Sequence, residues 1–522
     1  MLEKIRKLKD LIENRYLTEK YFYGLIIRAC LILALPVLYI GRYNHISGDC
    51  YWFAYAVHKS WQLTHNLFTV WEHSLATVAY YYENWQGTFT SLFFFTISPA
   101  AFGEQYAMVV PYMMMGMISI STILVFYVFL CRIFQFKRSS FMVIAVTAIM
   151  MQFQFMDSPA SGLYWYNGAV HYVFMQGFAY MMIAFSCLFF CSVAQGKKKR
   201  TYLYLILAVF NAFMASGANY STALFQMELV LLLTAVMTIC GVRIRQKRYW
   251  LYLSVTLVSA VGFLVNITAP GNAVRQGLYE KKSVWDTIVS SISYSAFQMT
   301  QWVSVYVVVT LLILLPVILK AVRGTRFTFP FPLLVPAACY CIYASMFAPG
   351  FYALGDVPFD RNQNICKMFF LISLIFCEIY LCGWLVKKGF LKRLIPVRGR
   401  NLWYWVICMG TGVVLCMVVF FSANRKTDLL SYAAWEAIAS GEGGRWQQEY
   451  YIRLNEYVNN PDPVIYVDPY TTYVYPLWVY QWTEIAHSED RKLDDSVARW
   501  YGKTAIYENE RNDAPDRKEE EE

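Results

Sequence analysis

The chain has 522 residues, of which 58% are hydrophobic and 18% aromatic, whereas only 15% are charged. A soluble domain usually carries about a quarter charged residues, so the composition argues against a soluble protein and favours an integral membrane protein. The 13 cysteines form no CxxC pair and no Cys/His cluster, so the sequence predicts neither a disulfide framework nor a zinc site.

The N-terminal stretch 1–20 is charged and amphipathic, and the first apolar run follows it directly. This run ends at Gly41, Arg42 and Tyr43, which is no small-residue cleavage site. It is therefore predicted to stay as a first membrane span and not to be removed as a signal peptide.

The rest of the chain is organised around long apolar runs. A helix needs roughly 20 mostly apolar residues to cross a bilayer. By that rule the sequence predicts an all-α polytopic membrane domain over 1–421 with about eleven spans, at 23–41, 106–130, 139–156, 171–194, 201–218, 222–242, 249–268, 298–319, 331–348, 365–386 and 402–421.

The basic residues collect on alternate connections between these spans. One set of connections carries 26 Lys and Arg residues, whereas the opposite set carries 6, namely Arg42, Lys59, Arg275, Lys281, Lys282 and Arg361. The positive-inside rule places the first set in the cytoplasm. This predicts a multi-pass protein of the cell membrane with a cytoplasmic N-terminus and an extracytoplasmic C-terminus, and the net charge of +10 then needs no nucleic-acid partner.

The outer loops carry the unusual residues. The first, 42–105, has aromatic and apolar residues at near-helical spacing and is predicted to form helices that lie in the membrane interface; a plain surface loop is the alternative. Polar, aromatic, Gly and Pro residues recur in the outer loops 157–170, 215–221, 268–297 and 348–364. Because these loops face one way, we expect one outward-facing site at the membrane surface.

The tail 422–522 is polar and is predicted to form a small extracytoplasmic α/β unit. It has a helical segment around Leu430–Tyr457 and a strand-like run at 464–470. The chain ends in Arg-Lys followed by four Glu, a composition typical of disorder. The tail could recognise an acceptor or only cover the membrane domain.

Four short motifs resemble a known group of proteins. An Asp just after the first span, in a long outer loop with interfacial helices, resembles the GT-C superfamily of membrane glycosyltransferases. More narrowly, the sequence is similar to a family of bacterial polytopic, glucosyltransferase-like membrane proteins in the motifs SGDCYWF at 47–53, ENWQGTF at 83–89, APGN at 269–272 with Arg275, and VARWYG at 497–502.

The resemblance implies an activity and a base. GT-C enzymes take a sugar from a polyprenyl-phosphate carrier and give it to an acceptor outside the cytoplasm. In many of them the acid of the first outer loop deprotonates the acceptor hydroxyl, and here that residue is Asp49. The family typically has a second acid directly after it, whereas this chain has Cys50, and this departure argues against a two-carboxylate or metal-binding mechanism at this position.

The chemistry needs one base and a cation for the departing phosphate. The catalytic candidates are Asp49, Glu83 and Asp157, and the substrate-binding candidates are Arg275, Arg361, His171 and Trp85. Five of them have a structural alternative: Asp49 could cap the helix that starts at Cys50, Asp157 could form a turn, Glu83 could be interfacial charge, and the two Arg could be merely solvated. No metal ligand is predicted, and the metal requirement stays open.

Two acids, Glu228 and Glu378, lie within predicted spans, where charges are costly and usually functional or paired. They keep open the alternative of a transporter or flippase for a lipid-linked or anionic substrate. No inverted repeat favours that alternative. The expected partners are the lipid bilayer, a lipid-linked sugar and a glycan or lipid acceptor. A non-catalytic assembly protein of the cell envelope is the third possibility.

Overall fold

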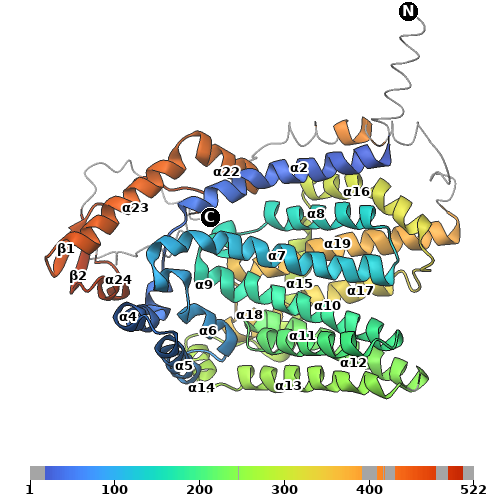
Figure 1. The fold of residues 1–522 in the computed structure, drawn as a ribbon, viewed down its shortest axis with the longest axis horizontal. Coiled ribbons are helices and arrows are strands. Elements are labelled where there is room, and N and C mark those ends of the chain that lie inside the picture. Colours follow the sequence, from blue (N-terminus) through green and yellow to red (C-terminus); the bar gives the residue numbers. More distant parts are fainter. Residues whose placement is uncertain are drawn as a thin grey trace, which may run out of the picture.

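The fold is a bundle of long helices with a smaller unit at one end (Figure 1). The computed structural model describes residues 18–244, 246–390, 408, 410–414, 417, 429–477 and 492–509. Within these residues, eight helical stretches are long and apolar enough to cross a membrane: Glu19–Tyr43, Glu104–Ile133, Tyr166–Ala194, Tyr220–Ile239, Lys247–Ile267, Val305–Gly324, Leu334–Leu354 and Asp360–Lys388. The chain is an all-α multi-pass membrane protein.

The bundle consists of these eight stretches and of further helices that are shorter or less apolar. Their bounds are α2 Glu19–Ile40, α7 Val110–Phe126, α8 Arg138–Gln154, α10 Met175–Ala194, α11 Lys198–Ser216, α12 Tyr220–Ile244, α13 Leu253–Ile267, α15 Val284–Trp302, α16 Val305–Gly324, α17 Leu334–Ser345, α18 Ala348–Leu354 and α19 Asp360–Lys388. α10 lies at the centre, where most of its side chains are buried. α2 lies at the periphery, with Leu31, Ile32 and Leu35 exposed as a lipid-facing stripe would be.

Three of the predicted spans differ from the eight stretches. The span at 139–156 corresponds to α8, which has only 17 residues, and that at 201–218 to α11, which begins with Lys198, Lys199 and Arg200. The span at 298–319 is wrong in its bounds, because the helix breaks at Val303 and restarts where the Ser304 hydroxyl accepts a hydrogen bond from the Val307 N–H. The eleventh, 402–421, falls largely outside the described residues.

Loop 42–105, the predicted first outer loop, contains the short helices α3 Cys50–Phe53, α4 Tyr55–Thr64, α5 Leu67–Asn84 and α6 Phe89–Thr96. α4 and α5 form a hairpin that runs across the long helices and is seen end-on in Figure 1. Leu63, Leu67 and Phe68, at the turn of the hairpin, are 83%, 69% and 73% exposed. An exposed apolar tip of this kind suits the membrane interface.

The tail lies at the same end of the molecule as this hairpin (Figure 1). It contains α22 Leu430–Ala439, α23 Glu442–Asn459, β1 Val464–Val467, α24 Asp495–Trp500 and β2 Ala505–Glu508, and β1 pairs in parallel with β2. The predicted helical segment is interrupted at Gly441, whose φ of 75° favours glycine. α22 packs along α2, and α24 packs on α3.

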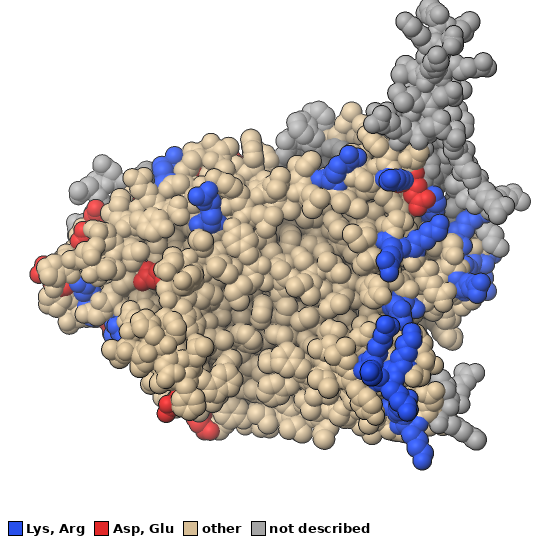
Figure 2. Space-filling model, viewed as in Figure 1, with Lys and Arg blue, Asp and Glu red and all other residues tan. Residues whose placement is uncertain are grey.

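The charges are distributed unevenly along the bundle. Figure 2 shows Lys and Arg side chains gathered over the end at which α2 begins and α12 ends, opposite the α4–α5 hairpin and the tail. The described residues of the basic connections therefore lie at one end of the bundle, and loop 42–105 and the described tail lie at the other.

Candidate functional site

A cavity of about 370 Å³ lies between the first outer loop, the membrane helices and the tail. Ligand sites typically have volumes of about 300–1,000 Å³. Five of the seven candidate residues line this cavity: Asp49, Trp85, His171, Arg275 and Arg361. They come from the first outer loop, the start of the third membrane stretch, the short helix α14 Pro270–Gln276 and the start of α19.

Asp49 follows a tight turn at Gly48, whose φ is 59°. It occupies the position before α3 but makes no capping hydrogen bond with its side chain. Instead its Oδ1 accepts hydrogen bonds from Asn167 Nδ2 at 2.8 Å and from Trp165 Nε1 at 3.1 Å. The two donors fix the carboxylate toward the cavity, so the helix-cap alternative does not describe what this side chain does.

Burial raises the pKa of the Asp49 carboxyl to about 6, while the hydrogen bond from Asn167, the charge of Arg361 and the hydrogen bond from Trp165 act in the opposite direction. A carboxylate with a pKa near the working pH is a better general base than one with an ordinary pKa near 4. The environment of Asp49 therefore suits proton transfer.

The two arginines line the same cavity as half-buried cations. The Arg361 guanidinium lies over the rings of Phe359 and Trp165, at 4.4 and 5.7 Å from their centroids. Within the described part of the chain, it has no carboxylate within ion-pairing distance. Arg275 donates to Gln86 Oε1 at 2.6 Å and lies 5.4 Å from the Trp85 ring centroid. Both retain donors for an anion, and a guanidinium matches a phosphate bidentately.

Two of the sequence motifs meet in the structure. Asn272 of the APGN motif accepts a hydrogen bond at Oδ1 from the Gly87 N–H at 2.8 Å, and its Nδ2 donates to the Asn266 carbonyl at 2.8 Å. Gly271 lies directly against the backbone of Trp85 and Gln86. This contact places Arg275 beside Trp85, so the motifs position the cavity wall.

The close approach at Gly271 gives a stability prediction. A Cβ at this position would overlap the backbone nitrogen of Trp85, so we expect Gly271→Ala to lower the free energy of unfolding by about 1–3 kcal/mol. The matched control is Gly116→Ala in α7, where nothing lies within 4 Å of the new atom. Thermal unfolding of both variants in one detergent checks this, and equal midpoints would contradict the close packing.

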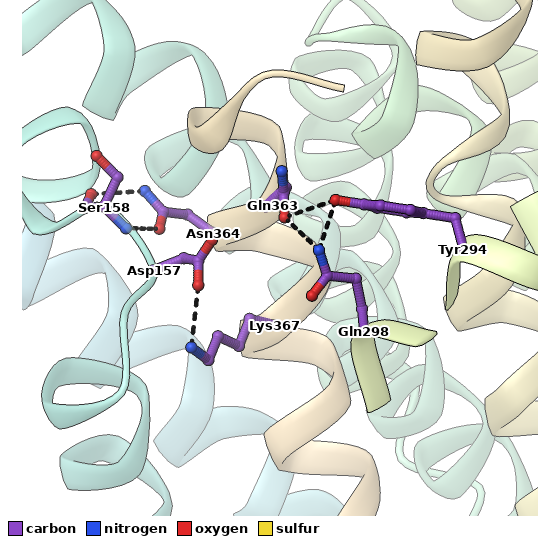
Figure 3. Close-up of polar contacts among 7 residues, drawn as sticks. All are labelled: Asp157, Ser158, Tyr294, Gln298, Gln363, Asn364 and Lys367. Atoms are coloured by element: carbon purple, nitrogen blue, oxygen red, sulfur yellow. Dashed lines mark hydrogen bonds and ion pairs between the residues drawn. The ribbon is translucent and has the colours of Figure 1, made fainter. Parts of the chain in front are cut away.

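Asp157 lies outside the cavity, in a polar cluster between its loop and α19 (Figure 3). Its carboxylate pairs with Lys367 at 3.1 Å. Asn364 exchanges two 2.8 Å hydrogen bonds with the backbone of Ser158, and Asp360 accepts from the Ser161 hydroxyl at 3.1 Å. Asp360, Asn364 and Lys367 follow one face of α19. These contacts connect α19 to the loop that leads to Trp165 and Asn167, and Asp157 lies at the start of that loop, outside the cavity.

Glu83 is also outside the cavity, exposed near the end of α5. His171, in contrast, is buried against the cavity, and no partner for its Nδ1 is found among the described residues. Elsewhere, Glu228 accepts a hydrogen bond from Ser345 at 2.7 Å, and neither Glu228 nor Glu378 lines the cavity. No group of three His, Cys, Asp or Glu side chains that could hold a metal ion occurs among the described residues.

Several cavity residues were not chosen as candidates from the sequence. Trp165 and Asn167 hold Asp49, and Asp494, Ser496 and Val497 of the tail form part of the wall. Trp165 and Asn167 lie in loop 157–170, and the polar and aromatic residues of this loop were the sequence feature that could have identified them. The tail residues lie just before and within the VARWYG motif.

The fold and this site define the class of the protein: a multi-pass membrane protein with two acids, two arginines and several aromatic rings in one cavity at one end of its bundle. Comparisons with protein-family models, with curated proteins and with solved structures found no match.

Proposed function

We propose that the protein is a glycosyltransferase of the GT-C type, which moves a sugar from a polyprenyl-phosphate donor to a glycan or lipid acceptor at the outer membrane surface. The observation that carries the proposal is the convergence of Asp49, Arg275 and Arg361 on one cavity. These residues are far apart in the sequence, and they supply the base and the phosphate-binding cations that the reaction needs.

In the proposed reaction, Asp49 takes the proton of the acceptor hydroxyl as its oxygen attacks the anomeric carbon of the donor sugar. The bond from that carbon to the phosphate oxygen breaks, and the electron pair leaves with the polyprenyl phosphate. Arg275 and Arg361 stabilise the charge of the departing phosphate, and His171 is a further donor to it. The proton on Asp49 is then released to water. The rings of Trp85 and Trp165 line the cavity in which the sugar would lie.

The direct test uses the purified protein in lipid nanodiscs with polyprenyl-phosphate-linked labelled sugars and cell-surface glycans or lipids. Release of polyprenyl phosphate together with a labelled acceptor is the expected result. Movement of intact lipid-linked sugar across proteoliposomes, with no bond cleaved, would instead support a transporter or flippase.

The pKa of Asp49 gives the reaction a pH dependence. Because a general base must be ionised, transfer should fall as the pH is lowered through about 6. The Arg361 charge lowers this pKa, so Arg361→Ala should move the midpoint of the profile upward. Initial rates between pH 4.5 and 8.5 at saturating donor check both points. A profile flat through pH 6, or an unmoved midpoint in the variant, would contradict the role of Asp49.

The orientation is part of the proposal, with the cavity on the extracytoplasmic side and the N-terminus in the cytoplasm. We expect a membrane-impermeant thiol reagent added to intact cells to label a cysteine introduced at the exposed Tyr451, but not one at Lys198. Opening the cells should allow labelling at Lys198. The unsubstituted chain is the control for native cysteines. The reverse pattern would place the cavity on the cytoplasmic side and would contradict the proposed use of a polyprenyl-phosphate donor at the outer membrane surface.

A further inference from the structure

One wall of the cavity comes from the tail. Asp494, Ser496 and Val497 line it opposite residues of the membrane domain. α24 is fixed there by aromatic contacts: the Trp500 ring stacks on His58 with centroids 3.7 Å apart, and the Tyr501 hydroxyl lies 3.5 Å from that of Tyr51, 450 residues away in the sequence. The tail is therefore packed firmly against the membrane domain where it lines the cavity.

A second contact anchors the same helix to the membrane domain. Glu104, which opens the second membrane stretch, accepts hydrogen bonds from Trp500 Nε1 at 3.1 Å and from the Tyr450 hydroxyl at 2.7 Å. Trp500 itself is 1% exposed. The Glu104 carboxylate thus holds both α23 and α24 against the membrane domain. This contact fixes the position of the tail relative to the membrane-domain residues that line the cavity.

The charges are divided between the two walls. The membrane domain contributes the cations Arg275 and Arg361 as well as Asp49, whereas the described part of the tail lines the cavity with the carboxylate of Asp494 and with no cation. Asp494 Oδ1 accepts a hydrogen bond from the Ser496 N–H at 2.7 Å. Among the described residues, no hydrogen-bond donor to its second oxygen is found, and Asp494 lines the cavity.

We propose that Asp494, with Ser496 beside it, forms the acceptor subsite, and that it selects a neutral or amine-bearing sugar over an anionic one. This inference rests on the proposed function. A lipid phosphate is attracted to the arginines and repelled by Asp494, so the donor lies on the membrane side and the acceptor on the tail side. A carboxylate accepts hydrogen bonds from sugar hydroxyls and attracts an ammonium group, whereas Asp494 and Asp49 together repel a sugar acid.

The test measures binding without a donor, so it does not depend on transfer. The probes are three oligosaccharides of one length that end in glucosamine, N-acetylglucosamine or glucuronate. Binding to the full chain in nanodiscs is followed by tryptophan fluorescence, because Trp52, Trp85 and Trp165 line the cavity. The expected order of affinity is amine, then N-acetyl, then acid, with about tenfold between the ends, which corresponds to about 1.4 kcal/mol.

The variant is Asp494→Asn, which keeps the cap of α24 because Asn caps helices as well as Asp does. We expect it to reduce the preference for the amine over the acid severalfold. The control is Asp495→Asn, which removes the neighbouring carboxylate. Asp495 pairs with Lys492 and does not line the cavity. This control should keep the preference.

Three results would overturn the subsite: no binding by the unsubstituted chain, an equal or reversed preference, or a preference unchanged in Asp494→Asn. If the preference depends on Asp494 but no sugar is transferred, the subsite stands and the proposed reaction fails. If transfer depends on Asp49 but the sugar preference does not depend on Asp494, the reaction stands and the subsite fails.

Discussion

Replacement of Asp49 by Asn is expected to lower sugar transfer by about 100- to 10,000-fold, the usual cost of losing a general base. The amide cannot take the proton of the acceptor hydroxyl. Folding should be preserved, because Asn has nearly the same size and keeps an oxygen that accepts from Asn167 and Trp165. Asp49 makes no capping bond to α3, so no helix cap is lost.

The matched control is Glu83→Gln, which neutralises an exposed acid of the same outer loop outside the cavity. It should leave transfer close to the unsubstituted rate. Both variants are compared by initial rate at saturating donor and acceptor and by thermal unfolding. A transfer rate of the Asn variant within a few fold of normal, with normal stability, would reduce Asp49 to a structural residue.

Removal of either cavity arginine is expected to weaken use of the donor. Hydrogen bonds to charged groups contribute about 1.5–3 kcal/mol, so Arg361→Ala or Arg275→Ala should raise the KM for the polyprenyl-phosphate sugar by about 10- to 100-fold. Lys should restore part of the loss, because it keeps the charge but not the bidentate geometry. The KM for the acceptor should change less, since the acceptor is proposed to lie on the tail side.

Arg42→Ala is the control for this pair. Arg42 is an exposed cation on the same side of the bundle, it lies over the rings of Tyr39 and Tyr43, and it does not line the cavity. Donor-dependence curves of all the variants in nanodiscs measure the effect. Unchanged donor dependence in both cavity variants would move the phosphate site elsewhere, with His171 and the pair Lys281 and Lys282 as the next candidates.

The position of Glu83 outside the cavity has a helical explanation. Successive residues of an α-helix are rotated by about 100°, so Glu83 points nearly opposite to Tyr81, which lines the cavity, whereas Trp85 returns to the Tyr81 side. The end of α5 could therefore have been read from its periodicity once one residue was known to face the cavity. No such local rule was available for Asp157, because its partner Lys367 comes from a distant helix.

The sequence by itself determined the multi-pass helical class and the helices of loop 42–105, and it singled out Asp49, Trp85, His171, Arg275 and Arg361 as candidates. Hydropathy and charge act locally along the chain, so they can be read without the fold. Only the tertiary structure decided that these five residues share one cavity and that the tail closes it. That convergence depends on packing between segments hundreds of residues apart, such as Trp500 on His58, which no local pattern encodes.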